Sequence, residues 1–286
     1  MPINTWSDIN AIGRAIQDDA TFVIRDLGQM QNMVTVFRDA SGMNPRIGYQ
    51  YNIGAAKTIA EVDDLMSESL TPLADQTLTP SEIGLQFFVT DVRRDSEAPE
   101  SIVTDAAREL GFAALQRVET DLVGDLANMT GSTVGAAGTT ITWGYLSAAI
   151  ARARNANKSA VVPLKCVIHG YQWAVLAKTA SVAGASSIAQ APGFTDEVTR
   201  MGRVAMFMGV PIYQTYVSPD TADDFVGGVF PMDALAIDWR RGVRIEAERD
   251  ASRRGTEFNM SAVYAHGVWR PARGVKMIFD ASAPTS

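Results

Sequence analysis

Residues 33–129 hold the pattern that most restricts the fold. Two strand-like segments, residues 33–37 and 84–92, carry the β-branched and aromatic side chains that strands favour. Between them, residues 48–81 form a mostly polar insertion without a sustained apolar period. Such an insertion cannot bury a core of its own. The pattern predicts a part that reaches toward a neighbour, in contrast to one that encloses a substrate.

The insertion is expected to fold back on itself as a two-stranded arm. With roughly seventeen residues per limb, the arm reaches roughly 55 Å. A lone hairpin of that length is at best marginally stable in water. It therefore needs another surface to lie on, and a second copy of the chain is the natural candidate. The alternative is a disordered surface loop, because loops this long are usually functional or disordered.

A long helix is predicted after the second strand-like segment. Residues 95–100 offer an N-cap candidate, early acids and a first-turn proline, and Gly131 supplies a stop. Over about thirty residues such a helix spans roughly 45 Å. Its apolar side chains recur at spacings of three and four and form one stripe, which makes the helix a spine packed on one side. The stripe consists of Val103, Ala107, Leu110, Ala114, Val118, Leu122 and Leu126.

The second half of the chain alternates short helices and strands, which indicates an α+β or α/β fold. Helices are predicted at residues 145–156 and 172–179. Strands are predicted at residues 165–169, 210–216, 226–230, 243–249, 257–265 and 274–279. The late strands are expected to complete the sheet that begins near Val34 and Val89.

Composition describes an ordinary globular chain of one or two domains. Of its 286 residues, 47% are apolar and 20% are charged. No apolar run is long enough for a membrane span, and the start lacks the features of a secretory signal. We therefore expect a cytosolic protein without a membrane partner. The single cysteine, Cys166, lies in an apolar run, which predicts a buried thiol and excludes disulfides within the chain.

Charge indicates protein–protein contacts more than nucleic-acid binding. A net charge of −7 argues against tight binding of nucleic acid through the whole surface. Acids gather in the insertion and arginines occur in pairs elsewhere, and arginine suits fixed pairing with carboxylates across interfaces. For any single pair, a solvated face is the alternative. The predicted intersubunit contact residues are Lys57, Glu61, Asp63, Asp64, Glu68, Arg240, Arg241, Arg253 and Arg254.

Catalytic candidates are weak, so we predict no catalytic, cofactor-binding or metal-ligating residues. The only two histidines, His169 and His266, are too few for a rich metal site. Cys166 and His169 lie three apart on a predicted strand, so their side chains point to opposite faces and cannot form a nucleophile–base pair. His169 is expected to be a packing residue at a strand end. Phosphate-binding loops, nucleophile elbows and paired cysteines are missing from the sequence.

In the order of its parts, the chain resembles the major capsid proteins of tailed bacteriophages, which share the Hong Kong 97-type fold. The resemblance extends over most of the chain. It is most specific in the second half, at residues 165–172 (KCVIHGYQ), 207–215 (FMGVPIYQT) and 228–236 (GVFPMDALA). The ending, with residues 244–246, 255–257 and 272–275, also fits.

The resemblance implies an α+β fold with five parts. These are an N-terminal arm (residues 1–40), an extended E-loop with its flanking strands (41–84), a peripheral domain (85–131 and 241–286) that contains the spine helix (96–129), and an inserted axial domain (132–240). The axial domain is expected to line the centre of a capsomer. The turn at residues 251–255 is expected to meet neighbours near a three-fold position.

The implied function is self-assembly into hexamers and pentamers and then into an icosahedral shell in the host cytoplasm. The shell would enclose double-stranded DNA, contacted weakly and without sequence specificity. The other implied partners are a portal protein, a possible decoration protein and a scaffolding protein. We expect the scaffolding protein to be separate, because the predicted N-terminal arm is short. The rival functions are an encapsulin-type bacterial compartment shell and an enzyme of unknown class.

One departure from the family concerns covalent chemistry. Some relatives crosslink a lysine of the extended loop to an asparagine of a neighbour. In this chain Lys57 and Asn259 are the conceivable pair, but nothing in the sequence identifies the acid that the reaction needs. An ordinary solvated lysine is the favoured interpretation.

Overall fold

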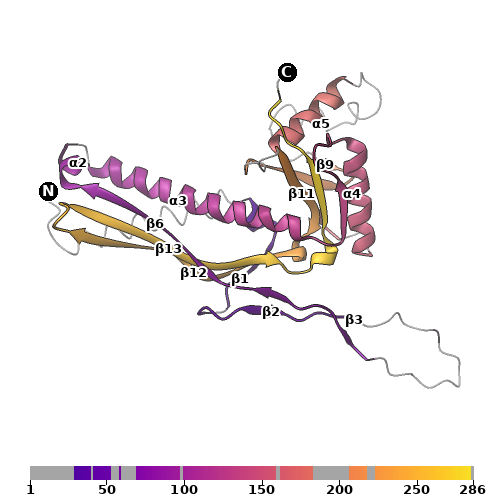
Figure 1. Cartoon of the computed structure of the whole chain (residues 1–286), viewed down its shortest axis with the longest axis horizontal. Coiled ribbons are helices and arrows are strands. Elements are labelled where there is room, and N and C mark those ends of the chain that lie inside the picture. The colour runs from indigo at the N-terminus through magenta and orange to yellow at the C-terminus, as the bar shows by residue number, and fades with distance from the viewer. Residues whose placement is uncertain are drawn as a thin grey trace.

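The computed structural model describes residues 29–39, 41–52, 58, 69–96, 99–158, 162–182, 206–217 and 223–284. Within them, a long helix lies along one sheet, a second sheet with two helices stands at one end of that helix, and a thin arm leaves in another direction (Figure 1). This mixed architecture confirms the α+β prediction.

The first sheet has four strands, and its long antiparallel ladder runs beside the helix (Figure 1). Two of the predicted late strands therefore do complete the sheet that begins near Val34 and Val89. Side chains alternate between the two faces of these strands, as the pleat requires. In order, the strands are β1 (Thr35–Phe37), β12 (Leu235–Asp250), β13 (Gly255–Val268) and β6 (Ser81–Thr90).

The helix α3 (Pro99–Gly124) covers one face of this sheet with the part of the expected apolar stripe from Leu110 onward, whereas the predicted positions of the Val103 and Ala107 side chains lie outside the described ones. Leu110 and Ala114 pack on the middle of the ladder, and Val118 and Leu122 pack nearer the second sheet. A separate short helix, α2 (Asp91–Ser96), precedes α3. The spine ends earlier than predicted, because the segment with Leu126 continues as the 3₁₀ turn η2 (Asp125–Asn128). A shorter 3₁₀ turn, η1 (Met30–Asn32), packs on the same cluster.

The second sheet has six strands and an apolar core of its own. The predicted strands at residues 165–169, 210–216 and 226–230 are found here. So are the two predicted helices, as α4 (Trp143–Ala156) and α5 (Gly170–Val182). The strand order is β7 (Ser132–Gly135), β14 (Val275–Asp280), β11 (Asp224–Pro231), β8 (Leu164–His169), β10 (Val210–Thr215) and β9 (Met206–Phe207).

One expectation about the last strand is wrong. Residues 274–279 were expected in the first sheet, but β14 lies in the second, parallel to β7 and antiparallel to β11. The 3₁₀ turn η4 (Pro271–Arg273) separates it from β13. Its alternate side chains are buried, and Phe279 is fully enclosed in the core of the second sheet. The apolar face of β14 is thus satisfied by α4 and its neighbours.

The chain returns from the second sheet to the first through one short turn. The 3₁₀ turn η3 (Met232–Ala234) joins β11 directly to β12. Phe230 at the end of β11 and Leu235 at the start of β12 share one apolar cluster with the C-terminal half of α3. The two sheets are therefore held by a common core where they meet.

Candidate assembly surfaces

The predicted two-stranded arm is present in the described residues. The strand β2 (Arg46–Gly48) pairs antiparallel with β5 (Gln76–Leu78), and farther out β3 (Tyr51–Asn52) pairs with β4 (Thr71–Pro72). The amide of Leu73 donates to the carbonyl oxygen of Gln50 at 2.8 Å between the two pairs. We call the described residues 46–52 and 69–78 the arm, and the four-stranded sheet with α3 the body. Figure 1 shows the arm leaving the body on the side away from α3.

The arm exposes a set of large apolar side chains. Tyr49 is 65% exposed, Tyr51 and Leu70 are each 59% exposed, and Leu73 and Ile47 are 49% and 47% exposed. Single exposed apolar residues are common, but several on one thin ribbon are typical of an interaction site. The exposed apolar side chains make the arm a candidate assembly surface.

The base of the arm packs on the face of the sheet opposite α3. Leu78 is buried against Ala236 and Ala265, and Phe37 and Trp269 border this cluster. The side-chain amide of Gln50 donates to the carbonyl oxygen of Trp269 at 2.7 Å. The base is therefore a packed part of the body.

Two arginines and two aspartates join the arm base to β1 and β12. Arg46 Nε of β2 donates to Asp238 Oδ2 at 2.7 Å, and its Nη2 pairs with Asp39. Arg240 Nη2 lies 2.8 Å from the same Asp238 oxygen. The Arg46 guanidinium also lies over the Phe37 ring, 4.4 Å from its centroid. The hydrogen bond to Asp238 raises the pKa of Arg46, and the hydrogen bond from Arg46 lowers the pKa of Asp39.

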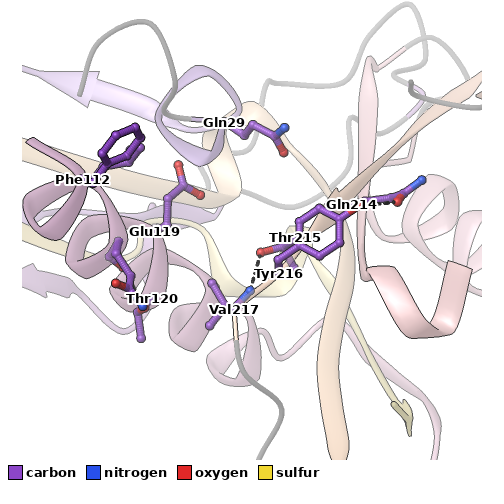
Figure 2. A pocket seen from close by; sticks show the side chains of 10 residues that line it. Gln29, Phe112, Glu119, Thr120, Gln214, Thr215, Tyr216 and Val217 are labelled. Carbon is purple, nitrogen blue, oxygen red and sulfur yellow. Dashed lines mark hydrogen bonds between the residues drawn. The ribbon is translucent and has the colours of Figure 1, made fainter. Parts of the chain in front are cut away.

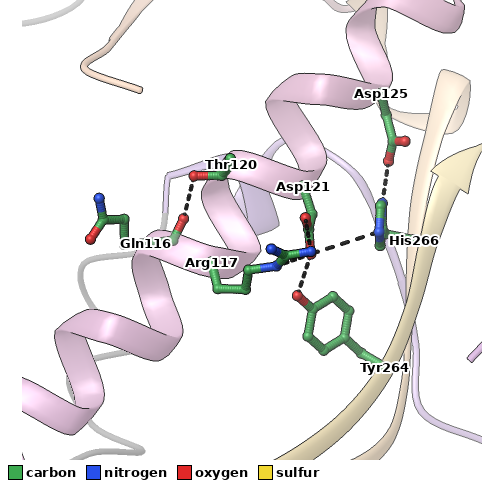
Figure 3. Close-up of polar contacts among 7 residues, drawn as sticks. All are labelled: Gln116, Arg117, Thr120, Asp121, Asp125, Tyr264 and His266. Atoms are coloured by element: carbon green, nitrogen blue, oxygen red, sulfur yellow. Dashed lines mark hydrogen bonds and ion pairs between the residues drawn. The ribbon is translucent and has the colours of Figure 1, made fainter. Parts of the chain in front are cut away.

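A polar network joins α3 and η2 to β13 (Figure 3). His266 Nδ1 lies 2.9 Å from Asp125 Oδ2, and the Tyr264 hydroxyl donates to Asp121 Oδ2 at 2.6 Å. Arg117 Nε also donates to Asp121 Oδ2, at 3.1 Å. The Asp125 contact raises the pKa of His266, and the charge of Asp121 acts in the same direction. The network fixes the C-terminal half of the spine on the sheet.

The far end of the body is also closed by charged contacts. Arg249 pairs with Asp91 through two bonds of 2.7 Å each, which ties β12 to the start of α2. In the turn between β12 and β13, Asp250 accepts a hydrogen bond from the amide of Ser252 at 2.9 Å. Arg253 Nη1 donates to Glu257 Oε1 at 2.8 Å, and its guanidinium lies 4.6 Å from the centroid of the Phe88 ring.

The predicted contact residues fall into two groups. The arginines are described: Arg240 is buried on Asp238, Arg241 pairs with Glu82, and Arg253 pairs with Glu257. Arg254 has a positive φ of 50°, in the turn that ends at β13. The residues of the insertion lie outside the described residues, so their pairing with the arginines stays a prediction. These are Lys57, Glu61, Asp63, Asp64 and Glu68.

Cys166 and His169 lie where the sequence predicts, the first as a buried thiol and the second as a packing residue at a strand end. Cys166 is fully buried in the core of the second sheet, and burial raises the pKa of its thiol. His169 ends β8, is 3% exposed and packs against Phe225 with ring centroids 5.3 Å apart. Burial lowers the pKa of His169, so its neutral form is favoured.

A cavity of about 440 Å³ lies where α3 passes the end of β10 (Figure 2). Amide and hydroxyl groups line much of it, together with the rings of Phe112 and Tyr216. The Glu119 carboxylate accepts the backbone N–H of Met30 at 2.9 Å, and burial raises the pKa of Glu119. Glu119 thus serves to hold η1 against the spine.

Within the described segments, no helix is long and apolar enough to cross a bilayer. The same segments contain no group of three or more His, Cys, Asp or Glu side chains that could hold a metal ion.

Sequence reasoning missed Arg46 and Asp238, the pair that joins arm and body. A signal for Asp238 exists, since it is a lone acid in the apolar run Ala234–Trp239, and a fully buried carboxylate requires a cationic partner. Arg46 carries no such signal, because its partner lies 192 positions away. The exposed side chains of Tyr49, Tyr51 and Leu73 carry no signal either, because they belong to a segment without a sustained apolar period.

Comparison with known proteins identifies both the family and the fold. A sequence-family model described as phage capsid protein matches residues 74–277. No curated protein sequence matches the chain. Among solved structures, one from Mycobacterium phage Che8 has a TM-score of 0.65 at 18% identity, covering 90% of this chain and 92% of that chain.

Two further structures show how widely the fold occurs. The head of Helicobacter pylori bacteriophage KHP40 has a TM-score of 0.66 at 11% identity, covering 89% of this chain and 88% of that chain. A virus-like particle from Pyrococcus furiosus has a TM-score of 0.60 at 12% identity, covering 92% and 98%.

The structural matches identify the fold, and the family match identifies the class of protein. The fold is the Hong Kong 97-type capsid fold. The family match spans most of the chain, from the last residues of the arm through the spine and most strands of both sheets to β14. The chain belongs to the phage capsid protein family and is a major capsid protein, a structural subunit of the icosahedral shell of a bacteriophage virion.

Proposed function

We propose that the subunits assemble into hexamers and pentamers through the arm, and that these capsomers close around double-stranded phage DNA. The observation that carries this proposal is the arm itself. It is a thin ribbon with a packed base, and Tyr49, Tyr51 and Leu73 are exposed along it. A ribbon with such a surface gains stability when a neighbouring subunit covers it.

The geometry of the contact favours closed assemblies. The arm and the surface that receives it are different parts of the chain, so each contact is heterologous. Heterologous contacts close into rings when the rotation permits. Because each subunit gives one arm and receives another, many modest contacts add up to a stable shell.

We assign the parts of the chain by the family resemblance. Residues 41–84 form the extended E-loop with its flanking strands, and residues 1–40 form the N-terminal arm. Residues 132–240 form the axial domain at the capsomer centre, and residues 85–131 and 241–286 form the peripheral domain. The second sheet supports an axial unit built on β7, β8, β10 and β11, and β14 packs in that same sheet.

The remaining partners follow from the family resemblance. They are a separate scaffolding protein, a portal protein, possible decoration proteins, and DNA held without sequence specificity. Assembly takes place in the host cytoplasm. The subunit acts as a structural protein without catalysis, which agrees with the use of its charged groups in intrachain ion pairs such as Arg249–Asp91 and Arg253–Glu257.

The proposal is tested by shortening the arm while keeping β2 and β5. Gly48 and Gln76 form the facing pair of β2 and β5 that lies farthest from the body, so an Asn-Gly turn can replace residues 49–75 and close a short hairpin. The full-length and shortened chains are compared by electron microscopy and mass photometry. Circular dichroism checks that the body is folded in each.

Rings or shells that form only with the full-length chain support the proposal. Monomers from both chains, or shells from both, would overturn the role of the arm. Nucleic acid inside shells purified from infected cells supports the phage function. A protein cargo in its place would favour the compartment alternative, whose fold the shell shares.

A further inference from the structure

We propose that Arg46, Asp238 and Arg240, with Asp39, form a lock that sets the direction of the arm before any neighbour binds. We call these four residues the arm lock. The inference rests on the proposed function, because it concerns how the arm is presented to a second subunit. It makes Arg46 a positioning residue for assembly.

The centre of the lock is a buried carboxylate. Asp238 is 0% exposed and lies on the face of β12 that carries the arm base, beside Ala236 and opposite the spine. A buried carboxylate is strongly destabilising unless cations and hydrogen bonds compensate it. Arg46 Nε and Arg240 Nη2 supply this, at 2.7 Å and 2.8 Å from one Asp238 oxygen. The two arginines differ in origin, since Arg240 belongs to the body and Arg46 to the arm.

Arg46 bridges two acids at different depths. Its Nε reaches buried Asp238, while its Nη2 pairs with Asp39, whose side chain is 73% exposed. Two arginines and two aspartates balance in charge, so the group is neutral as a whole while the arm stays in place. If the arm swings away, Asp238 is left with Arg240 alone.

The surrounding contacts fix the orientation of the guanidinium. It lies over the Phe37 ring, and Phe37 meets Trp269 edge-on with ring centroids 5.2 Å apart. Two residues farther along β2, a Cβ at Gly48 would come within 2.6 Å of the Trp269 ring. Gln50 is bonded to the Trp269 carbonyl oxygen. The arm base is therefore restrained at three alternate residues of the chain, of which Arg46 carries the charge.

A fixed direction matters because the arm is a weak structure by itself. Its described pairs are short, and an isolated two-stranded ribbon is marginally stable in water. An arm held in its binding direction loses less conformational freedom on docking than a free one, which strengthens association. Lysine would replace Arg46 only in part, because its single ammonium group lacks the planar fork that bridges both acids.

The test measures arm direction in unassembled subunits as the distance between two spin labels, by double electron–electron resonance. Cysteines for spin labels are introduced at Ala74 in the arm and Glu109 on the spine, both exposed. The native Cys166 is buried and stays unlabelled. The variants Arg46→Ala, Arg46→Lys and Asp39→Ala are compared with Arg241→Ala. The last is the matched control, because Arg241 lies on the same strand as Asp238 but pairs with exposed Glu82.

We expect one narrow distance peak for the parent chain and for Arg241→Ala. Arg46→Ala should lose that peak and give a broad distribution, and Arg46→Lys should fall between them. Asp39→Ala keeps Asp238 neutralised and should broaden the peak only partly. This variant keeps the test informative if Arg46→Ala fails to fold. A narrow, unchanged peak in folded Arg46→Ala or Arg46→Lys overturns the proposal, and so does an equal loss in Arg241→Ala.

Assembly is measured separately on the same variants. We expect the association constant of the folded Arg46→Lys subunit to fall about ten-fold, which corresponds to about 1.4 kcal/mol. A parent chain that never assembles would overturn the proposed function but leave the distance result standing. A mobile arm with unimpaired assembly would show that the lock sets direction without serving assembly, and would overturn its positioning role.

Discussion

The arm and the six-stranded sheet treat their apolar side chains in opposite ways. In the six-stranded sheet, Leu146, Val229 and Phe279 are 0% exposed, enclosed by α4, α5 and the neighbouring strands. In the arm, Tyr49 and Tyr51 are 65% and 59% exposed. The sheet buries its apolar side chains within one chain, whereas the arm leaves its own exposed. The same driving force, removal of apolar area from water, acts on folding in the sheet and, in the proposed function, on assembly through the arm.

The largest effect on subunit stability is expected in the six-stranded sheet. Phe279→Ala should lower the free energy of unfolding by about 3–5 kcal/mol, because it removes a fully buried ring and leaves a cavity. Urea unfolding of unassembled subunits, followed by circular dichroism, measures this. A loss below about 1 kcal/mol would show that this region is not closed on itself, and the contrast with the arm would disappear.

A smaller effect is expected where the two kinds of surface meet, at the arm base. Gly48→Ala places a methyl group against the buried side of Trp269, within 2.6 Å of the ring in the present geometry. We expect a loss of about 1–3 kcal/mol from overpacking. Gly242→Ala is the matched control, since a Cβ there meets nothing within 4 Å. Equal thermal midpoints for the two variants would show that the arm base is not packed on the body.

Each sheet contains one histidine, and the two should change the stability of the subunit with pH in opposite directions. His266, on the four-stranded sheet, has a pKa raised mainly by its contact with Asp125, with Asp121, Arg117 and Tyr264 also close by. A raised pKa means that its stabilisation is complete below the unfolded value, near pH 6.5, and is lost as pH rises through the folded pKa. His266→Gln should remove this alkaline loss, of about 1 kcal/mol.

His169 should act in the opposite direction. Burial lowers its pKa, so the folded sheet binds fewer protons and loses stability as pH falls below the unfolded value. Thermal midpoints measured from about pH 5 to pH 9 in the parent chain and in single variants of His169 and of His266 separate the two contributions. An unchanged alkaline limb in His266→Gln would assign the effect to another group.

The smallest effect on the subunit is expected from the arm surface. Replacing Tyr49, Tyr51 and Leu73 together by serine should change the free energy of unfolding by less than about 0.5 kcal/mol, because these side chains have few partners within the subunit. The same triple variant should lose rings and shells in electron microscopy. A marked loss of subunit stability would show that the arm surface already packs on its own body.

Local patterns gave reliable expectations for the regular elements. The stripe with Leu110, Val118 and Leu122 indicated the spine, and the run around Cys166 indicated a buried strand. Helix periodicity and strand propensity depend on neighbours in sequence, so they are readable from the sequence. The polar insertion between two strands likewise indicated an arm.

Contacts between residues far apart in the sequence could not be predicted from such local patterns. The strand β14 alternates buried and partly buried residues as a strand of either sheet would, so its own pattern does not choose a partner. The choice depends on tertiary packing, because the buried side chains of β14 share one core with those of α4. The arm lock was hidden for a related reason, because Arg46 and Asp238 meet only after β2 and β12 have been placed.

The strand β12 gives the arm a mechanical connection to the far end of the subunit. It carries Asp238 near one end and Arg249 near the other, and Arg249 holds Asp91 at the start of α2. The eleven steps between them span at most roughly 36 Å of extended backbone, and two register shifts between Trp239 and Arg244 shorten this path. If, as proposed, a neighbouring subunit holds the arm, a pull on the arm would enter this strand at Asp238 and be carried as tension along it. Outward pressure on a closed shell would thus travel through covalent backbone across each subunit, with side-chain contacts only at the two ends of the path.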